Sequence, residues 1–262
     1  MPVLSDDQRR EAADRLWEAE RTRTTTEQLT ITYPDIEVGD AYRIQLLNVE
    51  RRVAEGAVVR GHKVGLTAKA MQEMFGVNEP DYGHLFDDMF VAEGSMVDCS
   101  RYFQPRIEVE VAFILGETLP MRGCTIADVL RATEFVCPAL EIIDTRMGWK
   151  FKLCDTIADN GSSAGIVLGG KVTPVDQVDL RTLGAVLRRN GEVIDTGASS
   201  AVMGNPANAV VWLANEVGRL GVKLEAGHTI IPGSCTKAHD VGPGSVIRAD
   251  FDVLGHVGVV FT

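Results

Sequence analysis

The sequence predicts an α+β protein with a helical N-terminal unit and a longer part built mainly from β-strands. Residues 5–21 and 38–55 carry helix start and stop signals, with apolar side chains at helical spacing. Residues 105–117 instead alternate apolar and other side chains, the period of a strand with one face in a core. Residues 228–261 alternate short apolar stretches with glycine turns. We therefore expect a helical unit over residues 1–56 and a β-rich domain over residues 57–262.

The N-terminal unit is expected to contain two helices with clear ends. Ser5 and Gln8 form the pattern of a capping box, so the first helix should run to about Arg21. The second helix is expected over residues 38–55, and Gly56 closes it. Both segments carry apolar stripes, which indicates that the helices bury one side each.

A strand is expected over residues 57–65, and it contains Lys63. This lysine stands among glycine and apolar neighbours, where partial desolvation lowers the pKa of an amine toward use in proton transfer. The alternative is a surface lysine with its head group in water. Residues 79–83 are expected to form a turn-rich loop, in which Asp81 is either a general base or a turn former.

The alternating strand at residues 105–117 places Glu108 and Glu110 on one face, one above the other. Two neighbouring carboxylates repel each other unless a positive charge lies between them. A hard divalent cation such as Mg²⁺ prefers oxygen ligands and supplies that charge. The alternative is an ordinary antiparallel strand whose outer face is in water.

A second acidic position strengthens the metal hypothesis. Glu141 lies inside the apolar run at residues 135–144, where a carboxylate is rarely left without a partner. Together with Glu108 and Glu110 it offers a cage of oxygen ligands. A buried salt bridge to Glu141 is the alternative.

The remaining elements follow from local signals. Residues 159–163 form a polar turn in which Asn160, Ser162 and Ser163 either hold a carboxylate through hydroxyl and backbone N–H groups or only turn the chain. The histidines at positions 228 and 239 are isolated and are interpreted as structural. Further expected elements are a short helix capped by Thr67 that carries Met71, Met74 and Phe75, a helix from Thr125, an irregular loop over residues 144–157, a hairpin at Asn190-Gly191, a helix over residues 205–220, and strands over residues 228–232, 245–251 and 257–261.

Composition limits the classes of partner. The chain has 262 residues, 45% hydrophobic and 24% charged, which is typical of one globular protein. A net charge of −11 argues against nucleic acid or an anionic membrane as the main partner. The five cysteines are odd in number and form no CxxC pair, so neither a disulfide framework nor a zinc site is expected. The sequence has no signal peptide and no apolar run of ~20 residues, which favours a cytoplasmic setting.

With these residues identified, the chain resembles the 2-keto-4-pentenoate hydratase family of the fumarylacetoacetate hydrolase superfamily. The matching stretches occur in the order of the family and span about residues 38–262. They are Gly61-His62-Lys63-Val64-Gly65-Leu66-Thr67, Glu79-Pro80-Asp81-Tyr82-Gly83, Gln104-Pro105-Arg106-Ile107-Glu108-Val109-Glu110, Pro138-Ala139-Leu140-Glu141-Ile142-Ile143-Asp144 and Asp159-Asn160-Gly161-Ser162-Ser163. The chain departs from the family pattern at Gly161, where alanine is expected, and in a shorter loop after Glu141.

The resemblance implies a core of mixed β-sheets wrapped in a roll, with helices outside. It implies Mg²⁺ or Mn²⁺ on Glu108, Glu110 and Glu141, and roles in proton movement for Lys63 and Asp81. It also implies that Ser162, with its neighbours Asn160 and Ser163, lies near the substrate carboxylate. The implied activity is hydration of 2-hydroxypenta-2,4-dienoate or a longer homologue in the degradation of aromatic or sterol rings. A homo-oligomer, associated with other enzymes of the pathway, is also implied.

Three other functions remain open from the sequence. A 2-oxo-3-hexenedioate (4-oxalocrotonate) decarboxylase of the same family needs a basic residue in the distal pocket for a second carboxylate. An acylpyruvate hydrolase usually carries aspartate as its third ligand, where this chain offers Glu141. A non-catalytic partner subunit would be favoured by loss of the metal-binding acids, and all three acids are present.

Overall fold

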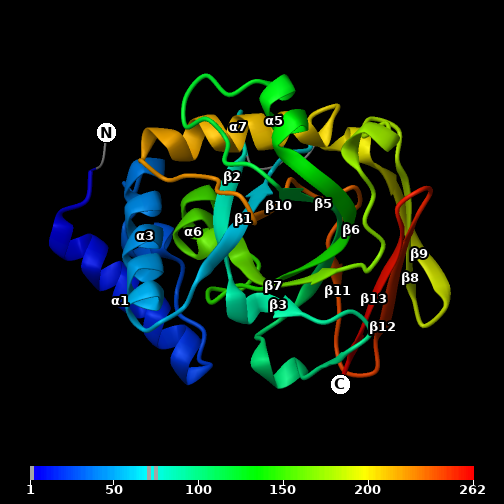
Figure 1. Ribbon diagram of the computed structural model, residues 1–262. Helices are drawn as coiled ribbons and strands as arrows, with labels where there is room; N and C mark the ends of the chain where they lie inside the picture. The colour runs from blue at the N-terminus through cyan, green and yellow to red at the C-terminus, as the bar shows by residue number, and fades with distance from the viewer. Residues whose placement is uncertain (1–2, 70–71, 74–75) are drawn as a thin grey trace.

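The computed structural model describes residues 3–69, 72–73 and 76–262, which form two β-sheets with helices on the outside (Figure 1). The larger sheet has the order β2-β1-β10-β5-β6-β7-β3, with β11 paired to β5, and the smaller has the order β4-β13-β12-β8-β9. The strands are β1 Val59–Gly65, β2 Asp81–Phe86, β3 Phe90–Val91, β4 Met96–Val97, β5 Arg106–Leu115, β6 Thr133–Ile143, β7 Ser163–Leu168, β8 Gly184–Arg189, β9 Glu192–Ala198, β10 Thr229–Ile231, β11 His239–Asp240, β12 Val246–Phe251 and β13 Gly255–Phe261.

Both sheets mix parallel and antiparallel pairs. In the larger sheet β1 runs parallel to β10, whereas β5 and β6 pair antiparallel over nearly their whole length. In Figure 1 the larger sheet curls round on itself, with the smaller sheet to the right and the helices along the top and left. The predicted α+β class with mixed, rolled sheets and outer helices is confirmed.

The N-terminal helices are α1 Asp6–Thr22 and α3 Val38–Ala54, with the short α2 Leu29–Thr32 between them. The predicted capping box is present, because Ser5 and Gln8 bond each other's backbone N–H groups. The helices share a buried apolar cluster with α6 Leu153–Ala158, through Leu16 and Ile44 on one side and Ile157 on the other. The helical unit therefore packs against the larger part of the chain, and its proposed boundary at residue 56 stays a prediction.

Strand β5 separates the main core from the carboxylate face. Its residues Ile107, Val109 and Val111 are fully buried in the largest apolar cluster, together with side chains of α7 Pro206–Arg219. The opposite face of the larger sheet carries a smaller apolar cluster that includes Ala112 and Ala139. The side of β5 that bears the glutamates therefore continues into dry, close-packed surroundings.

Two segments differ from the sequence prediction. Residues 81–86 form β2 and not a loop, because every residue from Tyr82 to Leu85 lies opposite a residue of β1 in an antiparallel ladder. Long-range pairing of this kind overrides the turn signals of Glu79, Pro80 and Gly83. The irregular loop expected over residues 144–157 ends in α6, whose first turn is capped by the Asp155 carboxylate on the Lys152 N–H.

The other predicted elements are present. Helix α5 Ile126–Ala132 is capped by Thr125, and α7 begins after Asn205 with Pro206 in its first turn. Asn190 and Gly191 join β8 to β9, both with positive φ, as a tight hairpin turn requires. A helix is also expected after Thr67, with Met71, Met74 and Phe75 on it. These three residues lie outside the described part of the chain. In the described part of the chain no helix is long and apolar enough to span a bilayer.

Candidate metal centre and active site

Three glutamates meet on one face of the larger sheet. Glu108 and Glu141 lie directly opposite each other in the β5–β6 ladder, and Glu110 follows Glu108 on the same face. Ligand oxygens of the three residues lie within 4.8 Å of one another, so the pairing brings together acids that are distant in sequence. Glu110 and Glu141 are fully buried, which excludes a solvated outer face for this part of β5.

The protein itself satisfies only part of this cluster. The Gly233 N–H donates a hydrogen bond of 2.7 Å to Glu110 Oε2. Glu110 Oε1 and both oxygens of Glu141 have no hydrogen-bond partner among the described residues. Among the described residues, Lys63 is the only cationic group within ion-pair distance of these oxygens, with its Nζ 3.6 Å from Glu141 Oε2. Buried carboxylate oxygens left in this state are costly without a cation.

The electrostatics of the cluster indicate the same need. Burial raises the pKa of Glu110 well above its ordinary value, and the charges of Glu141 and Glu108 raise it further. Burial also raises the pKa of Glu141 to about 8, although Lys63 opposes the shift. Acids that hold protons this tightly are strong ligands once deprotonated by a cation. Three carboxylates in this arrangement fit a hard divalent cation that prefers oxygen.

Lys63 and Asp81 lie beside the glutamates on β1 and β2. Each faces a glycine of the other strand, since Lys63 pairs with Gly83 and Asp81 pairs with Gly65. Both side chains are buried. Because Gly65 has no side chain, the two charged groups can share one small space between the strands.

The pKa of Lys63 differs from the sequence prediction. Burial alone lowers the pKa of its ammonium group, but the carboxylates of Glu141 and Asp81, followed by Glu108 and Glu110, raise it more. The pKa of the lysine is therefore raised, and the expectation of a neutral amine is wrong for the metal-free chain. The sequence could not show this, because the four acids come from three other strands.

Gly65→Ala tests the space shared by the two charged groups. A Cβ at residue 65 would lie 2.1 Å from Asp81 Oδ1 and 3.3 Å from Lys63 Nζ, so the carboxylate must move. We expect turnover to fall by about 10²-fold, while Mg²⁺ affinity, measured by calorimetry, stays close to that of the parent. Gly184→Ala on β8 is the matched control, because a Cβ there meets no atom of the described residues within 4 Å. Equal turnover in the two variants would contradict a role for Asp81.

The three side chains of the polar turn that are predicted to bind substrate each contact a different part of the protein. The Ser162 hydroxyl lies 3.1 Å from Thr156 Oγ1, and the Ser163 hydroxyl lies 4.0 Å from the sulfur of Met89. The Asn160 side chain bonds the backbone of His84. Substrate binding by Asn160, Ser162 and Ser163 therefore stays a prediction, and the structure gives each of them a contact within the protein.

The backbone of this turn does reach the site. Asn160, Gly161 and Ser162 have φ of 55°, 61° and 59°, a left-handed run that costs about 1–2 kcal/mol for each non-glycine residue. A Cβ on Gly161 would lie 3.2 Å from Lys63 Cδ. Glycine in place of the alanine expected from the family thus suits both the left-handed backbone and the passage of the lysine side chain.

A histidine cluster on the other side of β1 escaped the sequence reasoning. The ring of His62 lies 4.7 Å from that of His84 and 5.9 Å from that of His228. Burial lowers the pKa of His84 to about 4 and that of His62 well below its ordinary value, so both rings are neutral at working pH. His228 is therefore not isolated, and His239 bonds Asp195 at 2.8 Å. The contacts support the structural interpretation of both.

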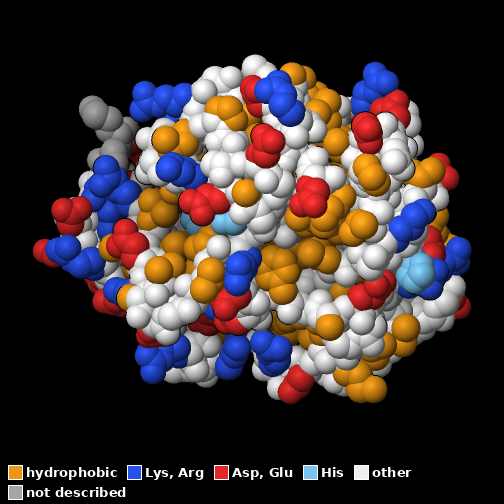
Figure 2. Space-filling view, in the orientation of Figure 1, with side chains coloured by type: hydrophobic (Ala, Val, Ile, Leu, Met, Phe, Trp, Pro, Cys, Tyr) orange, Lys and Arg blue, Asp and Glu red, His pale blue; other side chains and the backbone are white. Residues whose placement is uncertain are grey.

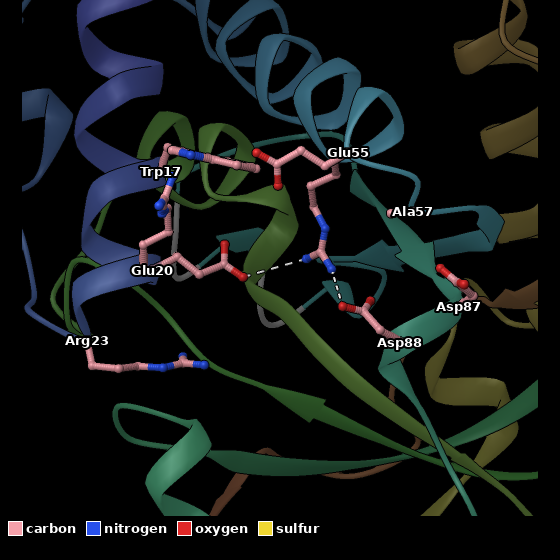
Figure 3. Close-up of a pocket in the computed structure, with 9 residues that line it drawn as sticks. Trp17, Glu20, Arg23, Glu55, Ala57, Asp87 and Asp88 are labelled. Atoms are coloured by element: carbon pink, nitrogen blue, oxygen red, sulfur yellow. Dashed lines mark hydrogen bonds and ion pairs between the residues drawn. The ribbon is translucent and has the colours of Figure 1, made fainter.

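A surface cavity is lined by residues other than the three glutamates. It has a volume of about 690 Å³ and opens between α1, the end of α3 and the residues after β2 (Figure 3). Arg52 crosses the cavity, 3.6 Å from Glu20 and 2.5 Å from Asp88, so these three charges are paired within the chain. Figure 2 shows acidic and basic side chains interspersed over the visible face.

The rolled mixed sheet and its buried carboxylates indicate the class of protein to which the chain belongs. The fumarylacetoacetate (FAA) hydrolase C-terminal family matches residues 54–261, and the chain belongs to this family. The expected resemblance is thereby confirmed.

Particular relatives cover nearly the whole chain. It is 42% identical to the 2-oxo-hept-4-ene-1,7-dioate hydratase of Escherichia coli, over 95% of this chain and 96% of that protein. It is 41% identical to the 2-keto-4-pentenoate hydratase of Paraburkholderia xenovorans, over 98% of this chain and 96% of that protein. The structure of 4-oxalocrotonate decarboxylase from Pseudomonas putida G7, complexed with magnesium and adipate, superposes with a TM-score of 0.96 over the full length of both chains, at 36% identity.

Proposed function

We propose that the protein is a metal-dependent hydratase that adds water to 2-hydroxypenta-2,4-dienoate or a longer homologue. The reaction passes through the 2-oxo-3-enoate tautomer and yields a 4-hydroxy-2-oxo acid. The observation that carries the proposal is the buried set of Glu108, Glu110 and Glu141 beside Lys63 and Asp81. Relatives named as hydratases, at 41–42% identity over nearly the whole chain, support it.

Each residue has a role that its position allows. A divalent cation held by the three glutamates supplies positive charge for the C1 carboxylate and the 2-oxo group. We propose Mg²⁺, as in the decarboxylase structure, with Mn²⁺ as a substitute. Lys63 carries the proton that moves to C5 on tautomerisation, and Asp81 takes a proton from the water that adds at C4. The neighbouring apolar cluster excludes further water.

A decarboxylase is the second candidate, and Arg106 is the observation that favours it. Arg106 lies two residues before Glu108 on the same face of β5, and its guanidinium packs over the Trp149 ring at 4.1 Å. Asp240 accepts a hydrogen bond from its Nε at 2.7 Å. Arg106 is therefore a basic group on the face of β5 that carries the glutamates, so a dioate substrate suits the site in either reaction.

One assay separates these functions. The purified protein, loaded with Mg²⁺, is given the pentadienoate, 2-oxo-hept-4-ene-1,7-dioate and 2-oxo-3-hexenedioate in parallel. Water addition without release of CO₂ supports the hydratase, and CO₂ release from the hexenedioate supports the decarboxylase. Cleavage of an acylpyruvate alone would favour the hydrolase branch. Metal binding without turnover of any substrate would support a non-catalytic subunit.

Stabilisation by Mg²⁺ is expected to grow as the pH rises. The pKa of Glu141 is raised from 4.5 to about 8 in the metal-free fold, which therefore binds more protons than the unfolded chain between these values. The free energy of unfolding of the metal-free protein then falls as the pH rises through this window. A bound cation restores the lost stability, because it compensates the charge of the deprotonated carboxylate. Melting temperatures with and without saturating Mg²⁺ across the window measure it. Taking the difference between the two melting temperatures cancels the contribution of the buried histidines to the pH dependence. A difference that shrinks as the pH rises would contradict the assignment of the metal to the glutamates.

We also propose that the protein self-associates, acts with other enzymes of its pathway and works in the cytoplasm. These proposals rest on resemblance to the family and on the composition of the chain. The acidic net charge of −11 favours a small-molecule substrate over nucleic acid or an anionic membrane, with the metal reversing the local charge for an anionic dienoate.

A further inference from the structure

Strand β2 forms one end of the larger sheet, and it carries Asp81. Among the described residues, the strand order places β1 on one side of β2 and no strand on the other. An end strand leaves alternate backbone N–H and C=O groups without a partner, which weakens its hold on its own side chains. In β2 those groups belong to Tyr82 and His84, because both bond side chains from outside the sheet.

Two side-chain amides occupy this free edge. Asn160 accepts from the His84 N–H at 2.7 Å through Oδ1 and donates to the His84 carbonyl at 2.9 Å through Nδ2. This two-way pairing is what a residue of a neighbouring strand would provide. One step along, Gln45 of α3 donates from Nε2 to the Tyr82 carbonyl at 3.0 Å and to the Ile157 carbonyl at 2.7 Å.

The turn that carries Asn160 also lies against Lys63. A Cβ on Gly83, the residue opposite Lys63, would lie only 2.1 Å from the Asn160 carbonyl oxygen. Gly161 lies against the lysine side chain itself, as its 3.2 Å approach to Lys63 Cδ shows. The same turn therefore fixes the edge of β2 and borders one side of the lysine.

We propose that Asn160 and Gln45 are positioning residues for the reaction, whose amides replace a neighbouring strand along β2 and hold Asp81 and Lys63 against the carboxylates. Asn160 then acts through the backbone of β2 and not by contact with the substrate. Gln45 lies on α3, so its hydrogen bond to β2 connects the helical unit to the strand that carries Asp81. The inference rests on the proposed function for its kinetic test and on the geometry alone for its other measurements.

The test compares Asn160→Gly with a matched control. Glycine keeps the left-handed backbone of residue 160 (φ 55°) and removes only the amide. Asn48→Ala is the control, because Asn48 Nδ2 also donates to a backbone carbonyl, that of Ala13 at 3.0 Å, but its hydrogen bonds within the described residues reach α1 and α3 and not β2. Asn160→Asp is a second variant of nearly unchanged shape that replaces the donor to His84 with an acceptor.

Three measurements are made on each protein. Hydrogen exchange of the peptide covering residues 81–86 should speed up by about tenfold in Asn160→Gly and not in the control. Turnover should fall by about 10²-fold with little change in KM, since misplacement of the reacting groups affects the chemical step. Mg²⁺ affinity should stay close to that of the parent, because the three glutamates lie on β5 and β6.

Other outcomes overturn the proposal. A raised KM with unchanged turnover and unchanged exchange of β2 would make Asn160 a substrate contact. Equal loss of melting temperature in Asn160→Gly and Asn48→Ala, with turnover kept in both, would make its role one of stability alone. If the parent protein turns over no substrate, the proposed function fails, while unchanged exchange in both Asn160 variants still decides against the positioning role.

Discussion

Glu110→Gln is expected to make the metal-free protein more stable and to remove its response to Mg²⁺. In the parent, Glu110 Oε1 is fully buried and has no hydrogen-bond partner in the part of the chain that the structure describes, and two other carboxylates lie beside it. An amide keeps the shape and can still accept from the Gly233 N–H, but it adds no charge to the cluster. The free energy of unfolding without metal should rise by about 1–3 kcal/mol at a pH above the raised pKa values.

The same substitution removes a charged ligand. Mg²⁺ affinity, measured by calorimetric titration, should fall by at least ~100-fold, and turnover should fall with it. Glu134→Gln is the matched control, because Glu134 lies on the neighbouring strand β6 but is exposed. We expect the control to change neither quantity. A metal-free protein that melts earlier than the parent, or unchanged Mg²⁺ binding, would remove Glu110 from the metal site.

The sequence could show which acids share a face but not which acids meet. Strand periodicity alone places Glu108 and Glu110 together, since successive side chains alternate. Bringing Glu141 to the same point depends on the register of β5 against β6, which pairs Glu108 with Glu141. A shift of one residue would have turned Glu141 to the other face, and nothing local in either strand fixes that register.

Local signals were reliable where local physics decides. The capping box of Ser5 and the Asn190-Gly191 turn were predictable because their hydrogen bonds or backbone angles involve only near neighbours. Strand β2 was not, because its backbone partners are β1, Gln45 and Asn160. The pKa of Lys63 was predicted in the wrong direction for the same reason: its neighbours in sequence are apolar, whereas its neighbours in space are carboxylates.

Lys63→Met is expected to lower turnover by about 10²–10⁴-fold while leaving Mg²⁺ affinity equal to that of the parent or higher. Methionine has a similar length and no charge, so the space between β1 and β2 stays filled. The lysine is a second cation for the same acids, with Nζ 3.6 Å from Glu141 Oε2. Its removal therefore leaves the acids free to bind the metal but takes away the group proposed to carry the proton.

Melting temperatures separate a chemical role from a structural one. Without metal, Lys63→Met should melt below the parent, because burial then raises the pKa of Glu141 with no opposing charge from the lysine. With saturating Mg²⁺ the two proteins should melt close together, since the cation replaces the lost positive charge. Lys223→Met, at an exposed position, is the control and should match the parent throughout. If Lys63→Met keeps full turnover in its Mg²⁺-loaded form, the lysine only balances charge, and the proton at C5 must come from another group.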